Sequence, residues 1–270
     1  MFGGIYLFRG GVLLDYTQFK KNIFELTRID LNAYKEKQMK RRIDALISKH
    51  KFNDYDSYVK AIKTDTKLFE EFVNYLTINV SEFYRNPEQW RNLKNEIYPY
   101  LINNFGKTLK VWSAACSTGD EPYSLVMTLA DFIPLKQIKI IATDLDKQVL
   151  EKAKAGLYNQ KSVAGLPEEY RRKYMTKIGL NNYQVKDEVK ACVEFKQHNL
   201  LKDDYPVGCD MIVCRNVVIY FTDEAKTEIY KKFHKSLKKG GILFVGSTEQ
   251  IMNYRALNYE SVKSFFYKTV

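Results

Sequence analysis

A turn rich in small residues and acids lies between Leu109 and Leu125, in the stretch LKVWSAACSTGDEPYSL. An apolar run ends there in small residues and one glycine, Gly119, so the backbone can approach a bound ligand closely. Asp120 and Glu121 follow in the first turn of a predicted helix, the place where a helix N-terminus binds phosphate. Their negative charges would repel a pyrophosphate, so a neutral or cationic ligand fits this turn better.

S-adenosylmethionine is such a ligand, because it has an adenosine, an amino group and a sulfonium cation but no phosphate. Glu121 could accept a hydrogen bond from the amino group. Asp144, which ends the apolar run in ATDLD, could accept hydrogen bonds from both ribose hydroxyls. Each acid also has a simpler interpretation, as a partner of the helix dipole or as a helix cap. Their presence in one strand–helix–strand unit favours a cofactor site.

Two further stretches carry polar residues in unusual surroundings. TINVSEFYRNP places Arg85 directly after an aromatic pair, and CDMIVCRNVVIYF places Arg215 and Asn216 inside an apolar run. A charged residue in such a run is expected at a strand end, where side chains face the ligand crevice. The alternatives are an ion pair with a nearby acid for Arg215 and a turn position for Asn216.

The elements that must position these residues differ between the two halves of the chain. From Asp15 to about Asn79, apolar residues recur at helical spacing, which predicts a bundle of three or four helices. A connecting helix is predicted over 86–105, with Pro87 near its first turn. Beyond it, the apolar runs LKVWSA, IKIIATD, CDMIVCR and GILFVG alternate with helical stretches. This alternation predicts a parallel sheet covered by helices on both faces.

One segment interrupts the alternation. After Gly156 a short helix near 167–174 precedes a stretch that alternates like two antiparallel strands joined near Lys186. We therefore expect an inserted antiparallel β-subdomain over about 156–199. The predicted organisation is an N-terminal extension at 1–14, a helical N-terminal domain at 15–85, the connecting helix at 86–105 and a doubly wound, Rossmann-like α/β domain at 106–270.

The composition is that of a globular protein with a strong positive charge. The net charge is +11 and 45% of the residues are hydrophobic, which favours an acidic partner such as nucleic acid, an anionic membrane face or an acidic protein. The four cysteines form no CxxC pair and only three histidines accompany them, so we expect no metal site. Buried, reduced thiols are expected instead, as in a cytoplasmic protein. No segment approaches transmembrane length, so we expect no membrane insertion.

Five motifs, in order over residues 15–270, resemble those of the chemoreceptor glutamate methyltransferases, the CheR family. They are NVSEFYR, VWSAACSTGDEPYSL, ATDLDKQVLEKAKAGLY, HNLL and CRNVVIYF. The resemblance implies a methyltransferase domain that uses S-adenosylmethionine, releases S-adenosylhomocysteine and esterifies glutamate side chains of bacterial chemoreceptors during chemotactic adaptation. Carried over by motif, it implies cofactor contacts at Asn79, Ser81, Arg85, Glu121, Asp144, Asn199, Leu200, Asn216 and Val217.

The resemblance also implies that Arg85 and Tyr220 lie nearest the transferred methyl group. The departures from the family pattern are mild. Ser81 keeps the hydroxyl of a common threonine, and the stretch from Gly246 to Glu249, GSTE, lacks a frequent histidine, so no role is predicted there. A glutamate is already ionised at neutral pH, with an ordinary pKa of about 4.3, so its methylation needs no general base. We expect Arg85 to guide the carboxylate and Tyr220 to orient it or cover the methyl group.

A basic stretch in the helical half provides the candidate partner surface. Lys37, Lys40 and Arg41 share one face of a predicted helix. This is either a solvated face or a docking face for the acidic cytoplasmic coiled coil of a chemoreceptor. A nucleic-acid methyltransferase is the first competing hypothesis, with Cys214 as the thiol near the proposed site, and a non-enzymatic cofactor-sensing adaptor is the second. We expect a monomer with no nucleic-acid partner.

Overall fold

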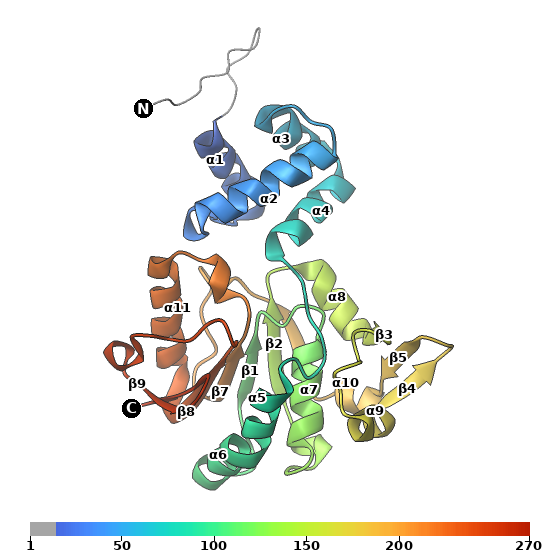
Figure 1. The fold of residues 1–270 in the computed structure, drawn as a ribbon, viewed down its shortest axis with the longest axis vertical. Helices are drawn as coiled ribbons and strands as arrows, with labels where there is room; N and C mark the ends of the chain where they lie inside the picture. The colour runs from blue at the N-terminus through green and yellow to red at the C-terminus, as the bar shows by residue number, and fades with distance from the viewer. Residues whose placement is uncertain (1–14) are drawn as a thin grey trace. The chain divides into compact units, whose positions relative to one another are not determined.

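The computed structural model describes residues 15–270 and divides them into two compact units, one ending at Leu76 and one spanning Thr77–Val270 (Figure 1). The predicted extension at 1–14 lies outside the described residues. Residues 77–85, which the sequence assigns to the end of the helical domain, group with the second unit. Within residues 15–270, no helix combines the length and the apolar character that crossing a bilayer requires.

The first unit is a helical bundle, as predicted. Its helices are α1 (Tyr16–Thr27), α2 (Glu36–Lys49), α3 (Tyr55–Thr64) and α4 (Thr66–Thr77). Asp15 caps α1 by accepting a hydrogen bond from the backbone N–H of Gln18, and Asp54 caps α3 in the same manner. The apolar residues at helical spacing point inward, and Phe19 and Phe72 are completely buried.

The second unit is built on a seven-stranded sheet with strand order β6-β2-β1-β7-β8-β10-β9. The strands are β1 (Val111–Ala114), β2 (Ile140–Asp144), β6 (Val193–Gln197), β7 (Cys209–Cys214), β8 (Leu237–Val245), β9 (Tyr259–Lys263) and β10 (Phe266–Thr269). Strands β6, β2, β1, β7 and β8 are mutually parallel, which confirms the predicted parallel sheet. The hairpin β9–β10, which the sequence did not predict, extends the sheet in antiparallel fashion. The strand order reverses at β1, so the expected ligand crevice lies at the carboxyl end of β1.

Helices cover both faces of this sheet. They are α5 (Pro87–Asn92), α6 (Tyr98–Phe105), α7 (Asp120–Leu129), α8 (Lys147–Ala155), α9 (Glu168–Tyr174), α10 (Asp187–Lys190) and α11 (Asp223–Ser236), with a π-helical turn at Leu93–Ile97 between α5 and α6. Val111 of β1 belongs to the core formed with α5, α6 and α7. Its neighbour Trp112 points to the opposite face and contacts Phe233 of α11. Leu150 of α8 packs with Ala142 of β2, which is in register with Ser113 and so lies on the same face as Val111.

The inserted segment forms a separate three-stranded antiparallel sheet in the order β3-β5-β4. Its strands are β3 (Leu157–Asn159), β4 (Met175–Ile178) and β5 (Asn182–Val185). The predicted pairing of the last two strands of this segment is wrong, because the run after Lys186 forms β6 and lies parallel to β2. The short helix α10 redirects the chain between β5 and β6, so the two strands cannot form a tight hairpin. Polar and apolar residues alternate in the antiparallel strand β5 and in the parallel strand β6 alike, so the sequence pattern could not show that the two strands belong to different sheets.

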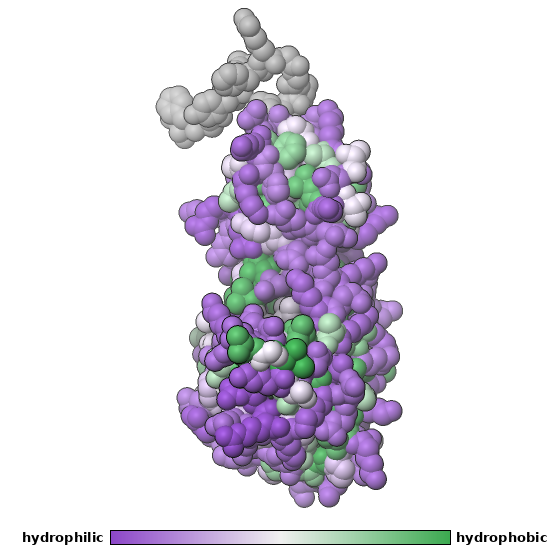
Figure 2. Space-filling view, turned by 90° about the vertical axis from the view of Figure 1, so that its right-hand side faces the viewer, coloured by the Kyte–Doolittle hydropathy of each residue, from purple (hydrophilic) through white to green (hydrophobic). Residues whose placement is uncertain are grey.

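The small sheet exposes several apolar side chains. Leu157, Ile178 and Leu180 are 52%, 45% and 85% exposed. Figure 2 views the molecule from the side on which Figure 1 draws this sheet, and it shows apolar patches among mostly hydrophilic residues. The short strands of the insertion therefore do not bury all of their apolar residues.

Candidate cofactor-binding and active site

The loop between β1 and α7 has an unusual backbone. Ala115, Ser117 and Gly119 have φ angles of 62°, 49° and 91°, which belong to the left-handed region. A Cβ atom at Gly119 would lie 2.9 Å from the Cβ of Ala153 and 2.9 Å from the hydroxyl of Tyr158. Only glycine fits this position, and the loop is held tightly against the start of α7.

Asp144, at the end of β2, closes this loop from the other side. Its Oδ2 accepts a hydrogen bond from Ser117 N at 2.8 Å, and its Oδ1 accepts one from Asp146 N at 3.0 Å. Burial raises the pKa of Asp144 to about 6. Each carboxylate oxygen can accept a second hydrogen bond, so the predicted contacts with ribose hydroxyls remain open. The sequence did not reveal that Asp144 also shapes the loop.

Glu121 has partners within the protein. Its Oε1 accepts a hydrogen bond from Ser113 Oγ at 2.8 Å, and its Oε2 lies 3.4 Å from Arg215 Nη1. Burial raises the pKa of Glu121, while the guanidinium of Arg215 acts in the opposite direction. The ion pair with a nearby acid is therefore the correct interpretation of Arg215.

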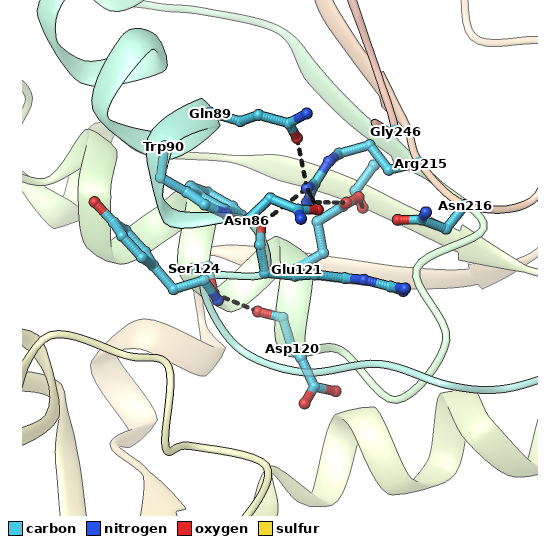
Figure 3. A network of polar contacts seen from close by, with 12 residues as sticks. Asn86, Gln89, Trp90, Asp120, Glu121, Ser124, Arg215, Asn216 and Gly246 are labelled. Atoms are coloured by element: carbon cyan, nitrogen blue, oxygen red, sulfur yellow. Dashed lines mark hydrogen bonds and ion pairs between the residues drawn. The ribbon is translucent and has the colours of Figure 1, made fainter. Parts of the chain in front are cut away.

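Arg215 also binds the segment that carries Arg85 (Figure 3). Its Nη2 donates to the carbonyl of Arg85 at 2.8 Å and to Gln89 Oε1 at 2.8 Å, and it lies 3.3 Å from Asn86 Oδ1. The guanidinium lies over the ring of Phe244 at 4.7 Å from its centre. Arg215 thus holds the backbone of residues 85–89 in place through these hydrogen bonds. Nothing in the sequence pattern indicated these contacts.

The segment before α5 is anchored along its length to the loops of the second unit. Asn79 Nδ2 donates to Asp146 Oδ2 at 2.9 Å, and the hydroxyl of Ser81 hydrogen-bonds to Asp120. Further along, Tyr84 N donates to Ser124 Oγ at 3.1 Å. The structure thereby brings Ser81 to the start of α7, where Glu121 lies, and Asn79 to the loop after β2, which begins at Asp144.

This segment also carries three non-glycine residues in the left-handed region, namely Ile78, Tyr84 and Asn86, with φ angles of 51°, 57° and 61°. A β-branched residue such as Ile78 adopts this conformation only when its surroundings impose it. Strain of this kind is concentrated at functional sites.

A cleft of about 260 Å³ lies between this segment and the loops after β7 and β8. Its lining residues are Ile78, Val80, Arg85, Asn86, Asn216, Ile219, Tyr220, Ser247 and Thr248. The structure therefore brings together Arg85, Asn216 and Tyr220, which are far apart in the sequence. Tyr220 ends a 3₁₀ turn, Val218–Tyr220, that begins directly after Val217.

The remaining predicted residues follow β6. Asn199 Oδ1 accepts a hydrogen bond from Leu201 N at 2.9 Å, and Leu200 is 8% exposed. His198 N donates to the carbonyl of Asp144 at 2.9 Å, so this loop adjoins the end of β2. Asn199 and Leu200 accordingly lie at the same edge of the sheet as Asp144.

An adenosyl ligand fits the chemistry of these loops. The backbone can approach a ligand closely at the small residues of the turn. Ser117 Oγ is buried and has no hydrogen-bond partner among the described residues, so a polar group of a ligand would satisfy it. The acids Glu121 and Asp144 keep acceptor positions for an amino group and for hydroxyls.

The proposed docking residues belong to the first unit, on α2. Lys40 Nζ pairs with Asp44 at 2.9 Å, and Tyr55 donates to the same carboxylate at 2.5 Å. Hydrogen bonds with Tyr55 and with Asp44 raise the pKa of Lys40, so its ammonium group already has partners within the first unit. Lys37 and Arg41 are exposed and leave their charges to solvent.

The comparisons with known proteins cover both units. Residues 14–77 match the family model of the CheR methyltransferase all-alpha domain, and residues 79–265 match that of the CheR methyltransferase SAM-binding domain.

Several relatives are similar over nearly their whole length. One is a chemotaxis protein methyltransferase of Listeria innocua, 41% identical over 94% of this chain and 96% of the relative. Another, from Borreliella burgdorferi, carries the same name and is 30% identical over 91% of each chain. A third, chemotaxis protein methyltransferase Cher2 of Pseudomonas putida, is 34% identical over 88% of this chain and 90% of the relative. With both family domains present in order, the chain belongs to the CheR family and is an S-adenosylmethionine-dependent methyltransferase.

Proposed function

We propose that this enzyme transfers a methyl group to glutamate side chains in the cytoplasmic coiled coil of chemoreceptors, giving the methyl esters used in chemotactic adaptation. The names of its relatives, chemotaxis protein methyltransferases, support a chemotactic substrate. The proposal places the enzyme in the cytoplasm, acting as a monomer. The observation that carries the choice of a carboxylate is the composition of the cleft.

The residues that line the cleft include an arginine and a tyrosine but no histidine, lysine, aspartate or glutamate. Methylation of an amine or a nucleic-acid base releases a proton, for which a site usually provides a base. A glutamate is ionised at neutral pH and needs none. S-adenosylmethionine, when bound, supplies a methyl carbon on a positively charged sulfur. The protein's own task is then to orient the carboxylate and exclude water.

Arg85 is the proposed guide for the incoming carboxylate. Its Nη1 lies 3.5 Å from the carbonyl of Val80, a long contact that leaves the other guanidinium donors available. A guanidinium can bind a carboxylate through two parallel hydrogen bonds, which fixes its orientation as well as its position. Tyr220, across the same cleft, would orient the second oxygen or cover the methyl group.

The proposed cofactor contacts follow from the donors and acceptors that the loops leave available. Asp144 would accept from the ribose hydroxyls and Glu121 from the amino group. Val217 N already donates to Glu249 Oε1 at 2.7 Å, so Val217 would contribute its carbonyl or side chain. The proposed set is completed by the residues Asn79, Ser81, Arg85, Asn199, Leu200 and Asn216.

The nucleic-acid alternative is weakened by the state of its candidate nucleophile. Cys214 is completely buried in β7, and burial raises its pKa well above the ordinary value. A thiol in this condition is a poor nucleophile, because the thiolate is the reactive form.

The decisive experiment uses S-adenosylmethionine labelled in the methyl group and the purified cytoplasmic fragment of a chemoreceptor. We expect label on the receptor that alkali releases as methanol, because carboxyl methyl esters hydrolyse in base. A receptor fragment with alanine at its methylation-region glutamates is the control and should take up no label. Label that resists alkali, or that appears on nucleic acid instead, would refute the proposal.

The docking role of α2 requires a separate test. Lys37→Glu with Arg41→Glu should lower kcat/KM for the receptor fragment roughly tenfold at low salt, and the difference should shrink as salt rises. Lys136→Glu with Lys139→Glu is the matched control, since it reverses two exposed charges between α7 and β2. Equal effects of the two pairs would show that only the net charge matters and would remove the docking role.

A further inference from the structure

Glu249 occupies a position that the cofactor and substrate proposals leave unexplained. It lies in the loop after β8, is 5% exposed, and receives four backbone hydrogen bonds. Its Oε2 accepts from Asn216 N at 2.5 Å and from Gly246 N at 2.9 Å. Its Oε1 accepts from Val217 N at 2.7 Å and from Val218 N at 2.8 Å.

Three of these four donors belong to the turn after β7, the turn that carries Asn216 and leads to Tyr220. Asn216 has a φ angle of 62°, so its backbone is in the left-handed region, which is sparsely populated by residues other than glycine. In that conformation the successive N–H groups of 216–218 converge on one point. Without an acceptor, three backbone donors, that of Val218 buried and those of Asn216 and Val217 partly buried, would be left unpaired.

The chemistry of the contact requires an ionised carboxylate. All four partners are N–H donors, so neither oxygen of Glu249 can act as a donor toward them. Burial raises the pKa of Glu249, and the backbone N–H groups act in the opposite direction. An amide of the same size would direct its NH₂ group at two of the four N–H groups.

Gly246 provides independent evidence for this arrangement. A Cβ atom at this position would lie 2.5 Å from Glu249 Oε2 and 2.8 Å from Asn216 N. Both are closer than atoms in contact can approach, so glycine is required because the carboxylate and the turn occupy the space. Glu249 N also donates to the carbonyl of Gly246 at 3.0 Å, which closes the loop that presents the carboxylate.

We propose that Glu249 is a positioning residue that holds the Asn216–Tyr220 turn in its cofactor-facing conformation by binding the backbone N–H groups of Asn216, Val217 and Val218. This inference rests on one part of the proposed function, namely that Asn216 and Val217 contact the cofactor. Glu249 itself does not touch the reacting atoms. The loops after β7 and β8, which line the same cleft, are thereby locked together.

The test measures binding of S-adenosylhomocysteine by calorimetry, so it does not depend on any receptor substrate. Glu249→Gln should weaken binding by at least about tenfold, because one of the two acceptor oxygens becomes an NH₂ donor and the two backbone hydrogen bonds to that oxygen are lost. Thr269→Val is the control for stability. Thr269 Oγ1 donates to the carbonyl of Lys238 at 2.7 Å near the amino end of β8, away from the cleft. This variant should lose melting temperature but keep its affinity within about twofold.

Gly246→Ala supplies a second perturbation that leaves the carboxylate in place. It should weaken S-adenosylhomocysteine binding as Glu249→Gln does, yet have a smaller further effect in a Glu249→Ala background, where the contact with the carboxylate is gone and only the contact with Asn216 remains. Additive losses in this cycle, or unchanged affinity in both single variants, would overturn the proposal.

Amide hydrogen exchange on the unaltered protein covers the case in which the variants do not fold. In ligand-free protein the amides of Asn216, Val217 and Val218 should exchange at least about a hundredfold more slowly than in an unstructured peptide. Exchange at the unstructured rate would mean that Glu249 does not hold the turn, and the proposal would fail.

Discussion

Arg215→Met is predicted to be among the most destabilising single substitutions in the second unit. Methionine keeps most of the buried aliphatic stem but removes the guanidinium, which leaves the Glu121 carboxylate without its counter-charge. It also removes the Nη2 donor to Gln89 Oε1 and one of the two donors to the carbonyl of Arg85, which keeps its hydrogen bond from Trp90 Nε1 at 2.9 Å. Breaking a buried pair by removing one partner costs roughly 3–5 kcal/mol. We adopt about 4 kcal/mol, a large part of the 5–15 kcal/mol typical of a whole domain.

Thermal and urea unfolding provide the measurement. For a unit of this size, each kcal/mol corresponds to roughly 2–4 °C, so the melting temperature should fall by about 8–16 °C. The loss should be smaller in mild acid. Burial already holds the folded-state pKa of Glu121 above its ordinary value, and losing Arg215 raises it further. The penalty is therefore present above that folded-state pKa and is relieved as the pH falls through it.

A second variant tests the physical reason for the loss. Adding Glu121→Gln to Arg215→Met removes the unpaired charge, so the double variant should be more stable than Arg215→Met alone. A loss below about 1 kcal/mol in the single variant would contradict the reasoning, and so would strictly additive losses in the double variant.

Three further predictions concern the same edge of the sheet. Arg85→Ala should keep the fold, and it should keep the affinity for S-adenosylhomocysteine within an order of magnitude. It should lower kcat by at least about a hundredfold, because the proposed guide of the carboxylate is lost. Arg91→Ala, which removes an exposed arginine of α5, should change neither the affinity nor kcat. Asp144 has a folded-state pKa of about 6 against an ordinary 3.8, so its ionisation costs the folded state up to about 3 kcal/mol as the pH rises through that window. In urea unfolding, the wild-type protein should therefore lose stability relative to Asp144→Asn between these pH values, and a constant difference would count against a raised pKa. Gly119→Ala should lower the free energy of unfolding by more than about 1 kcal/mol, since the φ angle of Gly119 is 91° and a Cβ atom there would lie only 2.9 Å from the Cβ of Ala153. An unchanged urea-unfolding curve would show that the loop adapts to the added methyl group.

Much of the fold could be predicted because its signals are local. Alternation of short apolar runs with helical stretches is a property of neighbouring residues, and it correctly indicated the parallel strands and helices such as α8 and α11. The acids of the turn could also be found, since Glu121 and Asp144 stand at fixed places relative to a strand end. The strand β6 was misassigned because its pairing partner is chosen by packing against α7 and α8, not by its own pattern.

The connections between loops could not be predicted for a related reason. Arg215 reaches residues 85–89, and Glu249 reaches residues 216–218, across long stretches of sequence. In the sequence, Arg215 is a charge inside an apolar run, and Glu249 is one glutamate in a polar loop. Only the folded sheet places each of them beside the groups that it binds. The glycine at position 246 is visible in the sequence. The reason why glycine is needed there is the nearby carboxylate of Glu249, which only the fold reveals.

The distribution of charge explains why the turn selects a cation although the whole chain carries +11. Asp120, Glu121, Asp144 and Glu249 are gathered at the carboxyl ends of the strands with Arg215, which is the only buried basic residue among those the structure describes. Burial raises the pKa of all four acids, so keeping them ionised costs the folded protein stability. A sulfonium cation in this crevice offsets part of that cost, whereas a pyrophosphate would add to it. The net positive charge of the chain comes from other residues, among them the exposed Lys37 and Arg41 of α2. The buried acids of the second unit therefore favour a cationic cofactor, although the chain as a whole is positively charged.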